Sequence, residues 1–469
     1  MLYVKITSAI ITVLSTILSI LTLEYLIVLI VGLFSKKIKY PEAKEKLRYG
    51  VVISARNEQK VIAQLIESIR KSDYPQDKID VFVMAHNCTD QTAKVARECG
   101  YPAYVYEYNN DKEKTKGYSL RKLFTIIDES FGIKNYAGFH IFDADNILDK
   151  DYFSKMNDAF VYFEKKHIIT SFRNTKNFGS NAQTACYGLM YVISCPFESR
   201  GRMILNASAR IVGSGVLIGS DLLENGWDFV DISEDTDLGA QQVAKGYNVK
   251  YCDEAMYYDE HPTKFKAMCK QRTRWAKGGF VVFHKRFKEL FRACFGKGTS
   301  DTKPSMFSAY DYLATLGPLG MIGIGISLLD IIFKLFIPLF GIDSAPIWKN
   351  WAIGLATGFA IGYLWMVILG IICYIKEGKR IKHASTGVKI RSVFMLPIFL
   401  MLFTIFQIVA MFQRNNFKWD QTDHVDQADF SKFNSTAELQ EVNVVNDKVN
   451  EKIGDKDKLE DLDFNNQQI

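Results

Sequence analysis

Four apolar runs of membrane-spanning length limit what this chain can fold into. The first covers residues 6–34 with Glu24 as its only charge, and the others cover residues 312–340, 351–375 and 393–412. Each reaches the roughly 20 residues that a helix needs to cross a bilayer, where the backbone must form its hydrogen bonds internally. Any one run alone fits a buried helix of a soluble domain, but four together predict an integral membrane protein.

Basic segments beside these runs predict the orientation. Lys36, Lys37 and Lys39 follow the first run, and residues 376–383 follow the third. Lysine and arginine concentrate on the cytoplasmic side of membrane helices. The first run is also too long for a signal peptide and has no small-residue cleavage site, so it predicts a retained anchor. We expect a multi-pass protein of the plasma membrane whose main domain is cytoplasmic.

The charge is divided between the body of the chain and its end. Residues 420–469 hold 13 acidic and 5 basic residues, a net of −8, which leaves +14 for the rest of a chain whose formal charge is +6. This tail is polar and poor in aromatic residues, which predicts disorder. The basic body suits anionic membrane lipids. Its basic residues are scattered and match no nucleic-acid motif, so no nucleic-acid partner is expected.

The eight cysteines form no C-x-x-C pair and no zinc-like cluster with histidine. They indicate reduced thiols of a cytoplasmic protein, packed as small apolar side chains.

Between the first two apolar runs, strand-like and helix-like segments alternate. This alternation predicts a parallel α/β sheet, which binds ligands at the carboxyl ends of its strands. The expected strands are 49–54, 79–85, 103–106 and 139–142, and the expected helices are 61–70, 87–100 and 120–131. Arg56, His86, Asp143 and Asp145 all follow strand ends, so one crevice is expected to contain them.

Asp143 and Asp145 form a D-x-D pair at such a strand end. Mg²⁺ and Mn²⁺ prefer oxygen ligands and are often held by one or two carboxylates together with substrate phosphates. A cation held there offsets charge on a departing diphosphate. Lys116 and Gly117 precede the third expected helix, where the lysine can meet phosphate and the glycine permits close backbone approach.

A second acidic pair, Glu234 and Asp235, is the candidate for proton removal. A sugar hydroxyl is a poor nucleophile, so a carboxylate within hydrogen-bond reach must take its proton. We choose Asp235 as this base, with Glu234 orienting or tuning it. Asp231 and Asp237 lie close by, and neighbouring carboxylates also occur in ordinary solvated loops.

The segment Gln271-x-x-Arg274-Trp275 combines an amide, a guanidinium and an indole. The guanidinium is a planar donor for a diphosphate, and the indole is a flat face for a sugar ring. The alternative is an amphipathic helix with an interfacial tryptophan. Residues 265–277 and 283–295 are expected to be two such helices, at the membrane interface or on the plain surface.

Together these motifs resemble the membrane-embedded family 2 glycosyltransferases, the group of cellulose, chitin, hyaluronan and poly-N-acetylglucosamine synthases. The resemblance covers residues 51–279. It rests on S-A-R-N-E at 54–58, N-C-T-D at 87–90, K-G at 116–117, D-A-D at 143–145, G-S-G at 213–215, E-D at 234–235 and Q-R-T-R-W at 271–275.

The resemblance implies an α/β domain of GT-A type, Rossmann-like with a mostly parallel mixed sheet, together with a helical transmembrane region. It implies a UDP-sugar donor, an Mg²⁺ or Mn²⁺ cofactor and inversion at the anomeric carbon. The implied donor-binding residues are Ser54, Arg56, Glu58, His86, Lys116 and Asp143, the metal ligand is Asp145, and the catalytic residues are Asp235 and Glu234. The residues implied at the acceptor and diphosphate are Gly213, Ser214, Gly215, Gln271, Arg274 and Trp275.

Two departures from the family pattern bear on the substrate. Many relatives have an acidic residue where this chain has His86, and no gating-loop motif of cellulose synthases follows Trp275. The expected function is extension of a cell-surface polysaccharide. The alternatives are single sugar addition to a lipid and a silent membrane scaffold, and the intact carboxylates argue against the scaffold.

The domain boundaries expected from these patterns follow the runs and motifs. They are an anchor at 1–35, a catalytic domain at 40–282, an amphipathic interfacial segment at 283–308, three or more transmembrane helices within 309–413, and the acidic tail at 420–469. Residues 312–340 contain Asp330 and Lys334, so a re-entrant pair stays open for that run. A tail element around Trp419 and His424 resembles one of some relatives that faces the catalytic domain, so the side of the tail also stays open.

Overall fold

The computed structural model describes residues 2–381 and 384–413, so the predicted acidic tail lies outside the described residues. Eight strands form one sheet in the order β3-β2-β1-β4-β7-β6-β8-β5. The strands are β1 (Tyr49–Ala55), β2 (Ile79–His86), β3 (Ala103–Tyr108), β4 (Gly138–Asp143), β5 (Ile147–Leu148), β6 (Ile169–Thr175), β7 (Val216–Gly219) and β8 (Lys250–Asp259).

The expected mixed, mostly parallel sheet is confirmed. Strands β1 to β4 run parallel to one another, and β6 runs parallel to β8. Strand β7 is antiparallel to both β4 and β6, and β5 is antiparallel to β8. Because β1, β2 and β4 are parallel, their carboxyl ends meet at one edge of the sheet.

Helices cover both faces of this sheet because its central strands are apolar on both sides. Val52 and Phe82 point into one buried cluster, whereas Val51 and Val81 point into the other, as the two-residue period of a strand requires. The domain helices are α2 (Ile62–Arg70), α3 (Thr92–Glu98), α4 (Lys116–Phe131), α5 (Tyr152–Tyr162), α6 (Ala182–Val192), α7 (Ser199–Ile204), α8 (Glu234–Ala244), α9 (Phe265–Ala293) and α10 (Met306–Leu316).

Helix α9 replaces the two amphipathic helices expected at 265–277 and 283–295. It is continuous over 29 residues and passes through the expected domain boundary at 282. A Cβ at Gly278 would lie 1.7 Å from the Ser233 Oγ atom. This glycine therefore lets the helix pass close to the loop before α8 without a break.

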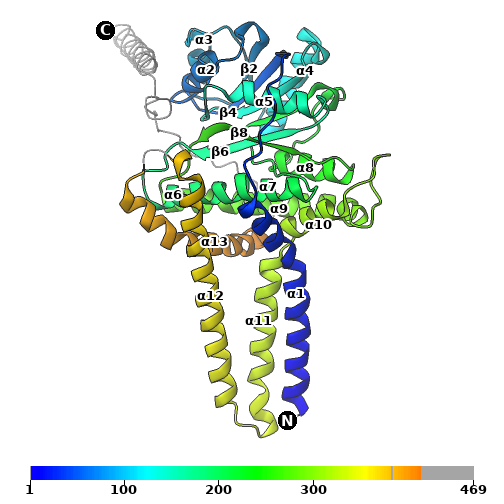
Figure 1. Cartoon of the computed structure of the whole chain (residues 1–469), viewed down its shortest axis with the longest axis vertical. Coiled ribbons are helices and arrows are strands. Elements are labelled where there is room, and N and C mark those ends of the chain that lie inside the picture. The colour runs from blue at the N-terminus through cyan, green and yellow to red at the C-terminus, as the bar shows by residue number, and fades with distance from the viewer. Residues whose placement is uncertain (1, 382–383, 414–469) are drawn as a thin grey trace, which may run out of the picture.

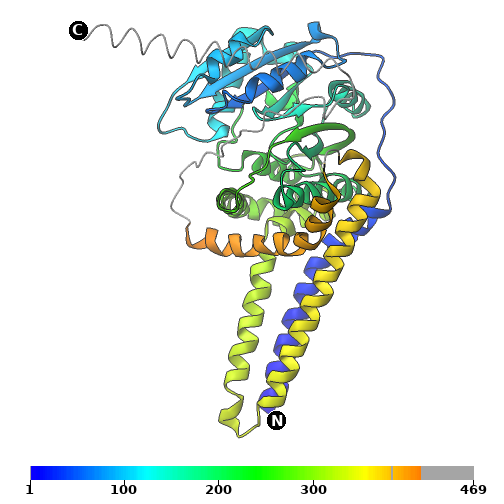
Figure 2. The same cartoon turned by 90° about the vertical axis from the view of Figure 1, so that its left-hand side faces the viewer.

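Among the described residues, four helices are long and apolar enough to cross a membrane. They are α1 (Leu2–Phe34), α11 (Leu319–Leu335, extended to Phe340 by a 3₁₀ turn), α12 (Ala345–Glu377) and α13 (Thr386–Phe412). Helices α1, α11 and α12 project side by side from the domain, whereas α13 lies across them beneath it (Figures 1 and 2). The apolar run 312–340 is divided at Gly317 and Pro318, where α10 ends and α11 begins.

Helix α13 is apolar on two faces. Leu396, Phe399 and Phe406 are buried in the core cluster shared with α6 and α9. On another face, Ile390 and Ile405 are 55% and 52% exposed. The first face attaches the helix to the domain, and the second leaves an apolar surface turned away from it.

The upper part of α1 is built into the domain. A helix of 33 residues is about 50 Å long, which exceeds a hydrocarbon core of about 30 Å. Gly32 of α1 and Gly201 of α7 lie where these helices cross closely, since a Cβ on either would overlap backbone atoms of the other segment. Beyond this crossing, the Lys37 Nζ atom lies 3.4 Å from Glu377 at the end of α12. The two basic segments thus meet at one end of the helices, as their charge pattern predicts.

Candidate active site

A cavity of about 900 Å³ opens at the carboxyl edge of the central strands and extends to the membrane helices. Its walls come from β1, β2 and β4, from α8 and α9, from residues 22–25 of α1 and 400–407 of α13, and from the end of α10 and the start of α11. The predicted site residues that line it are Ser54, Arg56, Glu58, His86, Lys116, Asp143, Asp145, Gly213, Glu234, Asp235, Gln271, Arg274 and Trp275.

Lys116 joins the two acidic motifs. Its Nζ atom lies 2.5 Å from Asp143 Oδ1 and 3.8 Å from Glu234 Oε1, and it donates to the Gly213 carbonyl at 2.8 Å. Burial lowers the pKa of Lys116, but Asp143 and Glu234 outweigh it and the net pKa is raised. Two carboxylate pairs separated by about ninety residues therefore face one cavity around a permanent positive charge.

The carboxylates of the D-x-D pair suit a cation that arrives with phosphate. Asp145 is 4% exposed, and its Oδ1 atom accepts a hydrogen bond from Asn146 Nδ2 at 3.2 Å. No group of three or more His, Cys, Asp or Glu side chains that could hold a metal ion occurs within residues 2–381 and 384–413. Magnesium commonly takes one or two carboxylates and completes its shell with water and substrate phosphates. The donor set here fits that arrangement.

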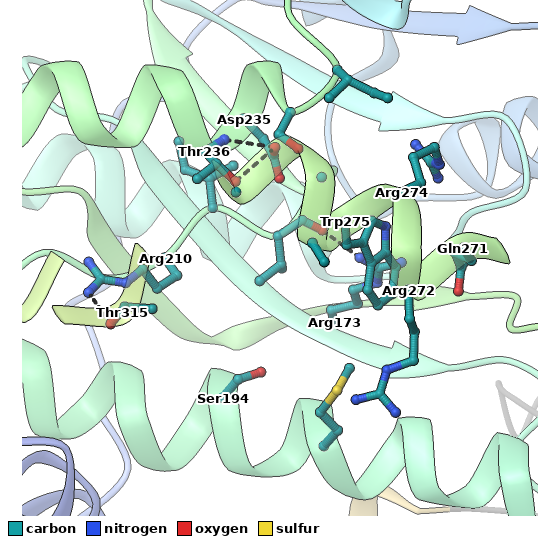
Figure 3. A pocket seen from close by; sticks show the side chains of 18 of the residues that line it. Arg173, Ser194, Arg210, Asp235, Thr236, Gln271, Arg272, Arg274, Trp275 and Thr315 are labelled. Carbon is teal, nitrogen blue, oxygen red and sulfur yellow. Dashed lines mark hydrogen bonds between the residues drawn. The ribbon is translucent and has the colours of Figure 1, made fainter. Parts of the chain in front are cut away.

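Glu234 and Asp235 begin helix α8. Burial is the main cause that raises the pKa of Glu234 to about 7, with Lys116 opposing it and Asp235 adding to it. Burial likewise raises the pKa of Asp235, whose Oδ1 atom accepts hydrogen bonds from the Thr236 amide at 2.7 Å and hydroxyl at 3.3 Å (Figure 3). Carboxylates with raised pKa values are stronger bases near neutral pH.

The neighbouring acids have other partners. Asp237 is fully buried and accepts hydrogen bonds from Lys285 at 2.7 Å and Arg286 at 2.6 Å, which attaches α8 to α9. Asp231 bonds Lys285 at 2.6 Å, and neither acid lines the cavity. Of these four neighbouring acids, Glu234 and Asp235 therefore line the cavity, whereas Asp231 and Asp237 do not.

The Gln271, Arg274 and Trp275 side chains share one face of α9 because they are three and four residues apart. Gln271 Oε1 accepts a hydrogen bond from the Tyr187 hydroxyl at 2.8 Å, and Trp275 packs edge-on against Tyr187. Burial lowers the pKa of Arg274, with Glu234 and Asp143 opposing it. These three residues lie along one wall of the cavity in Figure 3.

Arg272, between them in sequence, has a different partner. Its Nη1 atom donates to the Phe399 carbonyl at 2.6 Å, and its guanidinium lies 4.2 Å from the centre of the Phe399 ring. This residue attaches α9 to α13.

One side of the cavity holds Arg56, Glu58 and His86. Burial lowers the pKa of His86, whose ring stacks on Tyr108 and whose Nε2 atom lies 2.8 Å from the Glu113 carbonyl. The imidazole is therefore neutral at pH 7. Arg56 Nη1 is buried with no hydrogen-bond partner in the described part of the chain, so it has a donor to offer.

The predicted glycines have structural reasons of their own. A Cβ at Gly117 would lie 2.2 Å from the Phe229 carbonyl oxygen. The glycine is therefore needed because the loop that contains Phe229 passes close to the backbone there. Gly213 and Gly215 have φ angles of +91° and +64°, which favour glycine. Ser214 and Gly215 do not line the cavity, because Ser214 is fully buried and Gly215 packs against the Tyr257 ring.

Several cavity residues were not predicted from the sequence. Arg173 and Asp259 form a buried ion pair, and Arg210 donates to Thr315 Oγ1 at 3.0 Å. No strand, helix or motif was predicted at Arg173, Arg210 or Asp259, and Thr315 lies within the apolar run 312–340. Glu24 also lines the cavity. Its isolated charge in an apolar run was the one signal available.

Comparisons with known proteins agree with this geometry. Residues 47–278 match the family model described as glycosyltransferase like family 2. The chain is 26% identical over 260 residues to a probable glycosyltransferase, YdaM, of Bacillus subtilis, covering 53% of this chain and 59% of that protein.

Two further relatives carry more specific names. A β-monoglucosyldiacylglycerol synthase of Synechocystis is 23% identical and covers 49% of this chain and 47% of its own length. A poly-β-1,6-N-acetyl-D-glucosamine synthase of Staphylococcus epidermidis is 24% identical and covers 50% of this chain and 55% of its own length. The chain thus spans about half the length of the curated relatives it matches.

Among solved structures, the chain resembles the mannosyltransferase PcManGT from Pyrobaculum calidifontis, solved with GDP-mannose and Mn²⁺. The TM-score is 0.53 at 16% identity, covering 84% of this chain and 99% of that one. This likeness establishes the fold, and the expected GT-A type is confirmed. The chain therefore carries a family 2 glycosyltransferase domain over residues 47–278, joined to helices long and apolar enough to span a membrane.

Proposed function

We propose that the protein transfers a sugar from a UDP-sugar donor to a growing cell-surface polysaccharide, with inversion at the anomeric carbon. One observation carries the proposal: residues 143–145, residues 234–235 and the Gln271, Arg274 and Trp275 side chains line a single cavity although they are far apart in sequence. This set offers a phosphate-side carboxylate pair, a buried basic carboxylate and a guanidinium–indole face within one space.

The reaction is a single displacement. Asp235 takes the proton of an acceptor hydroxyl as that oxygen attacks the anomeric carbon, and the bond from this carbon to the diphosphate oxygen breaks. The nucleoside diphosphate leaves with the bonding electrons. The raised pKa of Asp235 supports the assignment, and the hydrogen bonds from Thr236 fix one carboxylate oxygen while Oδ2 forms no hydrogen bond within the described residues. The charge of the neighbouring Glu234 adjusts the pKa of Asp235.

A Mg²⁺ or Mn²⁺ ion bound with the donor supplies charge neutralisation at the diphosphate. Asp145 would hold it, with Asp143 beside the nucleotide. Lys116 and Arg274 bring two further positive charges toward the same acids. These side chains therefore favour a diphosphate over a neutral ligand.

The nucleotide base is assigned to the pocket beside Ser54, Arg56, Glu58 and His86. A neutral imidazole and an unused arginine donor can both form hydrogen bonds with a uracil ring. The GDP-mannose in the mannosyltransferase of like fold makes guanosine the natural competitor to test.

The acceptor is proposed to enter from the membrane side of the cavity. Beyond Trp275 the cavity continues to α1, α11 and α13, which leaves room for more than one sugar unit. A glycolipid acceptor that receives a single sugar is the second candidate. It is favoured by the apolar side chains of Leu319, Leu400 and Phe403 at the far end of the cavity.

We place the protein in the plasma membrane with the catalytic domain in the cytoplasm and α1, α11 and α12 as crossings. The meeting of Lys37 with the end of α12 supports this orientation. Helix α13 is assigned to the membrane surface, since it lies across the crossings and exposes an apolar face.

A donor panel tests the proposed function. Purified protein in detergent is incubated with UDP-glucose, UDP-N-acetylglucosamine, UDP-galactose, UDP-glucuronate and GDP-mannose, and nucleoside diphosphate release is measured with Mn²⁺ or Mg²⁺ and with a chelator. We expect UDP release from at least one donor, lost on chelation and in Asp145→Asn. Release of GDP alone would overturn the uridine assignment, and no release from any donor would overturn the enzyme assignment.

A further inference from the structure

The end of the cavity nearest the membrane contains two charged side chains with unused hydrogen-bonding atoms. Glu24 on α1 is 7% exposed, and its Oε2 atom has no hydrogen-bond partner within the described ranges 2–381 and 384–413. Arg210 donates through Nη2 to Asp311 at 2.6 Å and to Thr315 at 3.0 Å, whereas its Nε and Nη1 atoms are buried without a partner there. Figure 3 shows Arg210 and Thr315 on the side of the cavity away from Gln271 and Arg274.

These two groups carry opposite charges and line the same cavity, but they form no ion pair within 4 Å in the described structure. A buried polar group without a partner loses the full free energy of its hydration. One acceptor and two donors that line the same cavity therefore indicate a polar ligand between them. A sugar hydroxyl meets both needs because it accepts from a guanidinium and donates to a carboxylate.

The surrounding side chains favour a sugar over a simple ion. The Tyr312 ring lies under the Arg210 guanidinium at 3.9 Å, and the Tyr25 hydroxyl donates to Glu198 at 2.8 Å. The Tyr312 ring therefore holds the guanidinium in place, and the Tyr25 ring beside hydrogen-bonding groups suits the alternating apolar faces and polar edges of a pyranose. The charges at this end also include both Glu198 and Arg202, so they do not select an anion.

The position of the pair connects it to the reaction. Glu24 lies near the point where α1 enters the domain, since the Tyr310 hydroxyl of α10 donates to the Leu21 carbonyl one turn earlier. Asp235 and Trp275 line the same continuous cavity on the domain side. An acceptor that presents its terminal hydroxyl to Asp235 would place a following sugar unit toward Glu24.

We propose that Glu24, Arg210 and Thr315 form an acceptor subsite for a sugar unit at the membrane boundary. Neighbouring hydroxyls of that sugar donate to Glu24 and accept from Arg210. The inference rests on the proposed function because it concerns the acceptor of the same reaction. The sugar can belong to a polysaccharide chain or to a glycolipid headgroup, since both present the same hydroxyls.

The test separates sugar transfer from donor hydrolysis. Membranes containing the full chain are incubated with a radiolabelled donor that passes the donor panel, and three quantities are measured: nucleotide release, label in solvent-extractable lipid and label in insoluble polymer. In Glu24→Gln we expect transferred label to fall at least about tenfold, as for loss of a hydrogen bond to a charged group. Nucleotide release by hydrolysis in purified protein without an acceptor is expected to stay within about twofold.

Matched variants show whether a loss of transfer comes from misfolding or from the cavity. Ser19→Ala on α1 is outside the cavity and is expected to match the wild type. Leu319→Trp, which fills the same end of the cavity, is expected to reproduce the loss of transfer, whereas Ile324→Trp on the exposed side of α11 is not.

The two product fractions distinguish the sources of the sugar. Loss of polymer label alone identifies a polysaccharide, and loss of lipid label alone identifies a glycolipid. Unchanged transfer in both Glu24→Gln and Leu319→Trp would overturn the subsite, as would a parallel loss of transfer and hydrolysis. A wild type that hydrolyses no donor would instead reject the proposed function itself.

Discussion

Replacing Asp235 by asparagine is expected to lower the rate of sugar transfer by about 10²- to 10⁴-fold, the usual contribution of a general base. Asparagine keeps the size and the hydrogen bonds from Thr236, but it cannot accept the proton of the acceptor hydroxyl. The donor site is untouched, so the KM for the donor is expected to change little. Initial rates of transfer at saturating donor measure this effect.

Asp231→Asn is the matched control for that variant. It makes the same chemical change four residues away, on a side chain that bonds Lys285 outside the cavity. We expect transfer within about threefold of the wild type, because surface pairs of this kind contribute little. Full activity of Asp235→Asn, or equal losses in both variants, would show that Asp235 is not the base.

The second large effect concerns the junction between the domain and the membrane helices. Asp253 on β8 is fully buried and accepts hydrogen bonds from Arg200 at 2.5 and 3.0 Å and from Arg380 at 3.0 Å. Arg200 also donates to Glu377 at the end of α12. Burial raises the pKa of Asp253, but the two arginines outweigh it and the net pKa is lowered. This acid therefore stays ionised at neutral pH.

Asp253→Asn is expected to lower the free energy of unfolding by about 3–5 kcal/mol, because removing one partner of a buried ion pair leaves the other charges uncompensated. Denaturant unfolding in detergent micelles, followed by tryptophan fluorescence, measures the change. The control is Asp80→Asn, whose partner Arg48 is 48% exposed in its side chain. This control is expected to lower the free energy of unfolding by under about 1 kcal/mol. Equal costs in the two variants would contradict a structural role for this junction.

The first half of the domain could be predicted closely from the sequence. The four expected strands match β1 to β4 within two residues at each end, because each is a short apolar run that ends at polar residues. Parallel strands bring their carboxyl ends to one edge. This rule alone places Arg56, His86 and Asp143 together, and the structure has all three in the cavity lining.

The rest of the site depends on contacts that leave no local pattern. Strand β7 has only four residues and inserts antiparallel between β4 and β6. Arg173 and Asp259 are 86 residues apart, and Arg210 and Thr315 are 105 apart. No periodicity over a short window can indicate such pairs.

The direction of α13 relative to the other apolar helices could not be predicted from the sequence either. Hydropathy shows that residues 393–412 are apolar, but it does not distinguish a crossing helix from one that lies across the others. In α13 the deciding contacts are the burial of Leu396 and Phe399 against α6 and α9 and the hydrogen bond from Arg272. They are tertiary interactions between segments more than a hundred residues apart.

The most direct test is a crystal structure of the protein with UDP and Mn²⁺, in which the manganese is located by its anomalous scattering. We expect the ion within bonding distance of the Asp145 carboxylate, with the diphosphate beside Lys116 and the Asp235 carboxylate facing both across the same cavity. Manganese bound elsewhere, or a nucleotide seated away from Asp235, would contradict this expectation.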